Sequence, residues 1–298
     1  MSIERVTQRS LATHTLAGLQ QNLSRLGDLQ DQLSSGKAIN RPSDSPTGTA
    51  SSLALRAELA TNQQWSRNAD DGLAWLGTTD QTLTNALDPL RRARDLTVAG
   101  LNGGAADANA REAMALEIDQ IRQGLVGTAN TTYLGRPIFG GTTSTATAYD
   151  SNGTYQGPAT SPPITRVVGA NTAVRVDVTG PEVFGAAGAD LFTTLSDTAA
   201  ALRSGNTAAL QGTLGRLDSG ISGVTAKLAQ VGANYNRVQA LQQSAKDRVT
   251  SLTGSLSDVE NIDLPATIVA LNLAQVANQA ALAATAKVIT PSLSDFLR

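Results

Sequence analysis

The chain has 298 residues and a formal net charge of −2, with 41% hydrophobic, 16% charged and only 3% aromatic residues. This balance is unfavourable for a protein whose main ligand is nucleic acid, because nucleic-acid binding demands a concentrated basic surface. The absence of cysteine also excludes disulfides, thiolate metal sites and a cysteine nucleophile. With so few aromatic residues, the core must come from Leu, Val, Ile and Ala on helices packed side by side.

The first predicted element is a helical arm at the N-terminus. Its apolar residues recur at the spacing of one helix face and are Leu16, Leu19, Leu23, Leu26 and Leu33. A single helix with so thin a stripe is marginal in water, so we expect this arm to pair with another segment. The only histidine, His14, lies in the same arm. No motif supplies a catalytic partner for it, and we interpret it as a surface residue.

A bundle of helices is predicted to follow this arm. A mostly apolar series of positions at helical spacing runs from Ala69 to Arg94, and an apolar stripe at the same spacing runs from Met114 to Leu125. The sequence at 102–104, Asn-Gly-Gly, separates the two helices. The first helix carries a short basic cluster, formed by Arg91, Arg92 and Arg94. This cluster is either a solvated helix face or a contact patch for an acidic surface on a neighbouring subunit.

Residues 141–185 form a predicted β insertion between the helical arms. Two prolines at 162–163 would break a helix, and a strand follows them. Its period is that of a half-buried strand and is carried by Val174, Val176 and Val178. The segment from Ile164 to Val168 is the expected neighbouring strand. We expect the insertion to be an independent module that faces outward.

The strongest periodic signal lies in the second helical arm, between Leu217 and Val259. Apolar residues recur there in alternating steps of four and three, and twelve of the thirteen positions are hydrophobic. This pattern predicts the seam of a long coiled-coil helix.

A last helix is predicted at the C-terminus, with Pro265 near its first position. Its apolar stripe is thin and interrupted by polar residues, and it includes Leu264, Ile268, Leu271, Leu282 and Ile289. No window of the chain approaches the about 18 apolar residues of a membrane span. The first residues lack the apolar core of a secretory signal, and we expect a soluble protein.

Motifs that would indicate an enzyme are not found in the sequence. Around Lys37, Asp31 and Ala38 replace the glycine and the hydroxyl residue that a phosphate-binding loop requires. The Tyr149–Gly153 segment lacks the later acidic ligands of a calcium loop and is interpreted as a tight turn. We therefore predict no catalytic residue, no cofactor and no metal site.

Three parts of the chain resemble a known family. Leu33–Pro46, LSSGKAINRPSDSP, resembles the N-terminal signature of the flagellin superfamily. In that signature Gly36 ends one helix, and Ser45 before Pro46 begins the next. Asn68–Leu76 and Leu90–Leu96 are similar to the family's first bundle helix, and Asp258–Ala281 to its closing arm.

Within the superfamily, three details resemble the proteins of the hook–filament junction more than filament flagellins. The first is the Pro42–Pro46 sequence, PSDSP, although Ser45 replaces the commoner second Asp. The second is the turn within Asn130–Thr142, and the third is Gly180–Gly185, GPEVFG. The resemblance extends over both arms and most of the chain outside residues 142–178.

The resemblance implies a mainly α fold. Its N- and C-terminal arms build a long antiparallel coiled coil and a helical bundle, and a small β insertion interrupts them. Residues 1–40 with 262–298 would form an inner terminal domain. Residues 41–140 with 186–261 would form the bundle, and 141–185 the β insertion.

The resemblance further implies a structural adaptor of the bacterial flagellum, not an enzyme, that joins hook to filament and templates filament assembly. The alternative is a filament flagellin with a small outer domain, and a third reading is a soluble helical binding protein unrelated to flagella. We expect the terminal apolar stripes and the three arginines to form the assembly interface.

The implied partners are copies of the chain in a ring and a neighbouring hook-associated junction protein on the hook side. Flagellin or cap-side subunits are expected on the filament side, and a flagellar export chaperone before assembly, with no nucleic acid and no membrane. The implied location is the flagellum outside the cell, reached through the flagellar export apparatus without a cleaved signal peptide.

Overall fold

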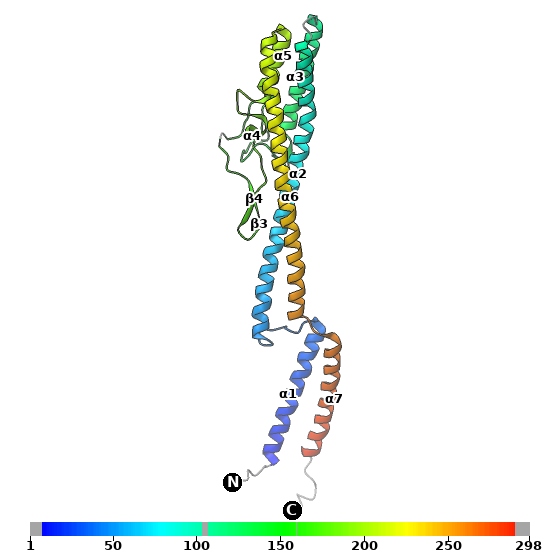
Figure 1. The fold of residues 1–298 in the computed structure, drawn as a ribbon. Coiled ribbons are helices and arrows are strands. Elements are labelled where there is room, and N and C mark those ends of the chain that lie inside the picture. Colours follow the sequence, from blue (N-terminus) through cyan, green and yellow to red (C-terminus); the bar gives the residue numbers. More distant parts are fainter. Residues whose placement is uncertain (1–7, 103–106, 159, 290–298) are drawn as a thin grey trace, which may run out of the picture. The chain divides into compact units, whose positions relative to one another are not determined.

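The structure is a computed structural model that describes residues 8–102, 107–158 and 160–289. Most of these residues are helical, which confirms the predicted mainly α fold (Figure 1). The helices are α1 Gln8–Ser35, α2 Pro46–Asn102, α3 Ala108–Ala129, α4 Gly180–Phe184, α5 Leu191–Ser204, α6 Thr207–Glu260 and α7 Leu264–Ile289.

The chain divides into two compact units. The first contains residues 1–60 and 249–298, and the second contains residues 61–248. Helices α1 and α7 belong to the first unit, together with the beginning of α2 and the end of α6. The sequence-based division into three domains has other boundaries, and it stays a prediction.

The second unit has a continuous apolar core between α2, α3, α5 and α6. On α6 every seventh residue of the predicted seam is fully buried, as Leu217, Val224, Val231 and Val238. The seam residues between them are half-buried and pack against the same core. This alternation confirms the coiled-coil pattern. The fully buried positions, seven residues apart, contribute most of the packing.

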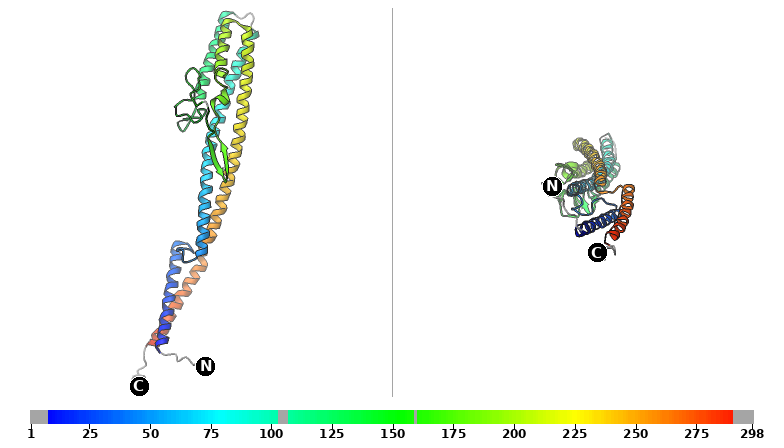
Figure 2. Two further views of the ribbon diagram at one scale, coloured as in Figure 1. Left: turned by 90° about the vertical axis from the view of Figure 1, so that its left-hand side faces the viewer. Right: turned by 90° about the horizontal axis from the view of Figure 1, so that it is seen from below.

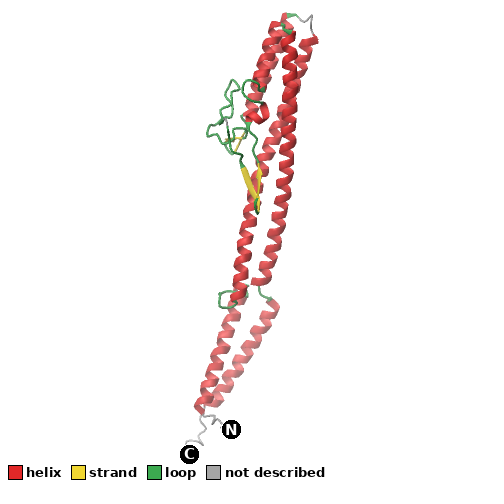
Figure 3. Cartoon of the chain, turned by 60° about the vertical axis from the view of Figure 1, so that its left-hand side comes forward, coloured by secondary structure: helices red, strands yellow, loops and turns green. Residues whose placement is uncertain are grey.

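Two small antiparallel hairpins lie in the second unit (Figure 3, yellow). Strand β1, Thr132–Tyr133, pairs with β2, Arg136–Pro137, and β3, Thr165–Gly169, pairs with β4, Thr172–Arg175. The β3–β4 hairpin confirms the predicted strand pair. Although β4 ends at Arg175, the Val176 N–H donates to the Ile164 carbonyl at 2.9 Å, so the pairing extends one residue further.

The insertion shares its core with the helices. Tyr149 packs against Phe184 and Phe192, with ring centroids 5.8 and 4.9 Å apart, and Phe139 packs edge-on against Phe184 at 5.3 Å. The three predicted strand valines are buried in the same hydrophobic cluster as the bundle residues. The expectation of an independent module is therefore wrong, because the insertion covers apolar surface that the helices leave open.

Candidate assembly interface

In the first unit, α1 and α7 lie side by side (Figures 1 and 2). Four of the predicted interface residues are half-buried there, namely Leu19, Leu26, Leu33 and Leu271. Polar residues stand among them, since Asn22 and Asn278 are half-buried too. The two terminal helices thus pair through a face that is only partly apolar, as the interrupted stripes predicted.

A second set of apolar side chains on these helices is exposed, and we call it the terminal apolar surface. Its members are Leu16, Leu23, Leu264, Ile268, Val269, Leu273, Val276 and Leu282. Leu273 is 66% exposed and Val276 is 63% exposed. Several exposed large apolar side chains on two paired helices favour an interaction site.

The structure distributes the predicted interface residues over both sets. Leu16, Leu23, Leu264, Ile268 and Leu282 are exposed, and the four leucines named above are half-buried. Ile289 ends α7, but its side chain lies outside the described residues. Val269, Leu273 and Val276 were not predicted as interface residues, because they lie outside the single apolar stripe of α7 on which that prediction rested. Because α7 is apolar on several faces, we expect other protein surfaces to cover it on several sides after assembly.

One helix segment, Leu264–Ala286, is long and apolar enough to cross a membrane, with a mean hydropathy of 1.2 and 6% of its window buried. The expectation that no segment would approach a membrane span was wrong, because the many alanines of this segment add to its leucines and valines and raise the mean hydropathy. Length and composition alone are weak evidence for a membrane span. Asn272, Gln275, Asn278 and Gln279 lie within the segment, and each amide side chain would lose its hydration in lipid.

The three arginines of the predicted contact patch have partners inside the same chain. Arg91 lies 3.0 Å from Asp88, one turn away on α2. Arg92 donates through Nε and Nη2 to both carboxylate oxygens of Glu117 on α3, at 2.7 and 3.1 Å.

The third arginine, Arg94, donates to Asp218 on α6 at 2.6 Å. Its hydrogen bond to Asp218 raises the pKa of the Arg94 guanidinium, as the bond to Glu117 does for Arg92. Arg92 and Arg94 therefore connect α2 to α3 and α6, whereas Arg91 pairs within α2. Their part in assembly stays a prediction.

A cluster that the sequence reasoning missed lies in the first unit, where α6 ends at Glu260. The Glu260 side chain is only 8% exposed. Its Oε1 accepts from Ser52 Oγ at 2.5 Å and from Arg56 Nε at 2.8 Å. Its Oε2 accepts from Arg56 Nη2 at 2.7 Å and lies 3.2 Å from Lys37 Nζ. We call Lys37, Ser52, Arg56 and Glu260 the Glu260 cluster.

The electrostatics of this cluster follow from its donors. The hydrogen bonds from Arg56, then Ser52, then Lys37 lower the pKa of the Glu260 carboxyl to about 2. The bond to Glu260 in turn raises the pKa of Arg56. No local pattern reveals this contact, because Ser52 and Glu260 are 208 residues apart in the sequence.

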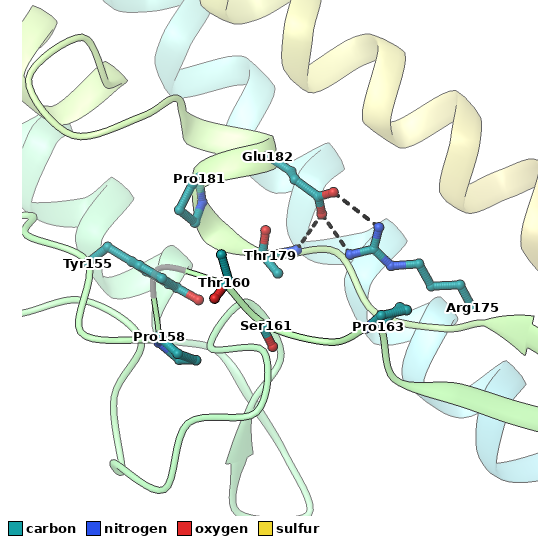
Figure 4. Close-up of a pocket in the computed structure, with 9 residues that line it drawn as sticks. All are labelled: Tyr155, Pro158, Thr160, Ser161, Pro163, Arg175, Thr179, Pro181 and Glu182. Carbon is teal, nitrogen blue, oxygen red and sulfur yellow. Dashed lines mark hydrogen bonds and ion pairs between the residues drawn. The ribbon is translucent and has the colours of Figure 1, made fainter.

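A cleft of about 500 Å³ lies beside the insertion, lined by residues that include Tyr155, Arg175, Thr179 and Glu182 (Figure 4). Arg175 donates to Glu182 at 3.1 and 2.9 Å and to Asp177 at 2.8 Å. Glu182 also accepts from the Thr179 N–H at 2.9 Å, at the first turn of α4. These charged groups are engaged with one another, and this arrangement fixes the loop before α4.

The remaining candidates for chemistry take structural places. Asp150 Oδ1 accepts the N–H groups of Asn152 and Thr154 at 2.9 and 2.8 Å, which confirms the tight turn interpreted at this segment. His14 is exposed on α1. Within the described residues, no group of three or more His, Asp or Glu side chains is placed to hold a metal ion.

Known proteins are similar to this chain over most of its length. Flagellar hook-associated protein 3 of Escherichia coli is 28% identical over 275 residues, which cover 84% of this chain and 86% of that protein. Flagellin of Bacillus subtilis is 26% identical over 275 residues, which cover 87% of this chain and 88% of that protein.

Solved structures have the same fold. The crystal structure of Bacillus cereus FlgL matches with a TM-score of 0.60 and 26% identity, covering 68% of this chain and 99% of that one. The flagellar junction protein FlgL from Legionella pneumophila matches with a TM-score of 0.57 and 14% identity, covering 70% and 99%.

Two family models match the arms that the sequence reasoning singled out. The N-terminal helical region of bacterial flagellin matches residues 6–144, and the C-terminal helical region matches residues 214–297. Together they span about three quarters of the sequence. With both helical regions present in their order along one chain, the protein belongs to the flagellin superfamily.

Proposed function

We propose that this chain is a structural subunit of the bacterial flagellum that joins the hook to the filament. The observation that carries the proposal is the match to junction proteins along nearly their whole length, 99% for Bacillus cereus FlgL and 86% for the hook-associated protein of Escherichia coli. Flagellins that reach 33% identity or more align with only about a third of this chain. Filament flagellin is thus the second candidate, supported by the full-length similarity to the protein of Bacillus subtilis.

The terminal apolar surface supports a role in assembly. In the monomer these side chains contact water, and covering each one by a neighbouring copy contributes about 1.5–3 kcal/mol for a fully buried aliphatic side chain. A ring of copies can cover the surface on every subunit with one repeated contact. The adaptor would then carry the hook's neighbouring junction protein on one side and flagellin or cap-side subunits on the other.

The same proposal includes the route by which the subunit reaches its place. It leaves the cell through the flagellar export apparatus without a cleaved signal peptide, accompanied before export by a chaperone. The exposed apolar residues of α1 and α7 support a chaperone, because such surface promotes aggregation before assembly. The role is structural, and no catalytic step is assigned to any residue.

Deletion of the gene tests the proposal against its alternative. A junction protein is required only to retain the filament, so the deletion strain should make hooks, export flagellin into the medium and carry no filaments. The intact gene on a plasmid should restore filaments. A deletion strain that lacks the major filament protein itself would favour the flagellin alternative. Normal filaments in that strain would contradict both candidates.

A further inference from the structure

Three separate parts of the first unit meet at one carboxylate. Lys37 belongs to the connector between α1 and α2, and Ser52 and Arg56 lie in the first turns of α2. Glu260 is the last residue of α6 and precedes the connector to α7. Its two oxygens accept three hydrogen bonds and one ion pair from these groups. A carboxylate offers about four acceptor positions, so the group is fully used.

The backbone joins the same two connectors. The Ala38 N–H donates to the Glu260 carbonyl at 2.6 Å, and the Ile262 N–H donates to the Gly36 carbonyl at 3.2 Å. Lys37 and Asn261 thereby form an antiparallel bridge. The chain leaves α1 through Gly36 at φ +71°, a left-handed conformation that other residues adopt only with strain. The ends of α1 and α7 are thus held together at one point.

Apolar packing does little to hold the first unit in place. Among its described residues, the buried side chains are Ser52, Leu252, Glu260 and Thr267. Only one of these four is apolar, whereas the second unit contains a large continuous apolar core. Hydrogen bonds to a charged group are directional and stronger than neutral ones. In the first unit the Glu260 cluster and the backbone bridge beside it therefore fix the geometry of the two connectors.

We propose that Glu260 is a positioning residue for assembly, which holds the two connectors together and so presents α1 and α7 as one preformed pair. The consequence for assembly rests on the proposed function, but the effect on the monomer does not. A preformed pair loses less conformational freedom when a neighbouring copy covers it, and it therefore assembles more readily. Without the cluster, α1 and α7 would each have to be ordered separately during assembly.

The test uses the whole chain, which contains no cysteine and can therefore be labelled at chosen sites. Spin labels at Ser24→Cys on α1 and Gln279→Cys on α7 occupy exposed positions. Pulsed electron resonance should then give one narrow label-to-label distance in the parent protein. Glu260→Gln keeps the shape and removes the charge, and we expect the narrow distance to be lost. Asp258→Asn removes a charge from an exposed position on the same turn and should leave the distance unchanged.

A second variant separates positioning from folding. Arg56→Lys keeps the positive charge but cannot make the two-point contact with Glu260, so it should broaden the distance less than Glu260→Gln does. Thermal melting of the bundle followed by circular dichroism should be the same in all variants. A narrow, parent-like distance in both Glu260→Gln and Arg56→Lys would overturn the proposal. Equal broadening with early melting of the bundle would overturn it too, since it would show a general folding role.

The assembly step is tested by returning each gene to the deletion strain and measuring filaments and motility. Parent and Asp258→Asn genes should restore filaments, and Glu260→Gln should lose most of this restoration. If Glu260→Gln broadens the distance but restores filaments fully, the positioning role in assembly is wrong. If the deletion strain already makes filaments, the proposed function fails, whereas the distance measurement still decides what Glu260 does in the monomer.

Discussion

Acidic side chains fix several turns of this chain by accepting backbone N–H groups. Asp44 Oδ2 accepts from Asn40 and Arg41 at 3.0 and 2.8 Å, which closes the turn between α1 and α2. Asp190 caps α5 by accepting from Thr193 at 2.8 Å. The Asp190 cap supplies a partner that the first turn of α5 lacks. Glu260 differs from these local caps, because its partners come from distant parts of the chain.

The lowered pKa of Glu260 makes a prediction about pH. Its folded pKa of about 2 lies below the about 4.3 of an unfolded glutamate. The stabilisation is therefore complete above the unfolded value and is lost as the pH falls through the folded one. We expect the label-to-label distance between α1 and α7 to stay narrow at pH 5 and to broaden only as the pH approaches 2.

Glu260→Gln provides the control for this prediction. Other carboxylates also titrate in this window, so urea unfolding of parent and variant should be compared at each pH. The difference in stability between them should shrink between about pH 4 and pH 2. A difference that is constant over this window would contradict the ionised state of Glu260.

At the scale of elements, α6 carries the packing of the second unit. Val231 is fully buried in the middle of its seam. Val231→Asp would bury an unpaired charge, and such a change destabilises by more than about 4 kcal/mol. We expect loss of the cooperative thermal transition, measured by circular dichroism. Lys227→Ala removes a side chain that donates to Gln230 at 3.2 Å in the same helix and should change the melting temperature little.

The insertion allows a second prediction at this scale. Removing residues 144–178 and closing the gap with a short Gly/Ser linker would take away Tyr149 and the predicted strand valines. It would also expose Phe184 and Phe192 to water. Loss of one large buried side chain already costs about 2–5 kcal/mol, so the deletion should abolish cooperative melting of the bundle. A deletion variant with parent-like melting would show that the insertion is dispensable for the core.

Local patterns predicted those elements whose packing repeats along the sequence. The α6 seam was visible because its apolar residues recur every three or four positions, and β3–β4 because apolar and polar residues alternate there. The turn within Asn130–Thr142 was identified only through the family resemblance. No local pattern predicted its strands β1 and β2, whose tip is Leu134 at φ +48°, a conformation that leucine rarely adopts. The Glu260 cluster was missed because contacts between distant residues leave no local period.

At the scale of the whole molecule, the two units differ in how complete their cores are. The second unit buries most of its large apolar side chains, such as Phe139, Leu83 and Leu195. In the first unit many of the large apolar residues of α1 and α7 remain exposed. A chain that folds one part by itself and leaves another to be covered is suited to assembly, because the same contact repeats on each copy.

The terminal apolar surface makes the last prediction. Val276 and Leu282 are 63% and 50% exposed, so changing both to Ser should leave the melting of the monomer and the pairing of α1 with α7 intact. Leu271 is less suitable for this purpose, because it is half-buried and its loss would also weaken the pair. In the assembly each lost aliphatic contact costs about 1.5–3 kcal/mol when the side chain is fully buried.

Because this loss recurs at every subunit contact, the double variant Val276→Ser with Leu282→Ser should fail to join filament to hook. The cells should still build hooks and release flagellin into the medium, where it can be measured by immunoblot. Leu116→Ser removes an equally exposed leucine, 51% exposed on α3, and should support normal filaments. If the double variant melts as the parent does and still carries full filaments, α7 does not form the assembly contact. If it melts early, these side chains act in folding, and the surface must be sought on another helix.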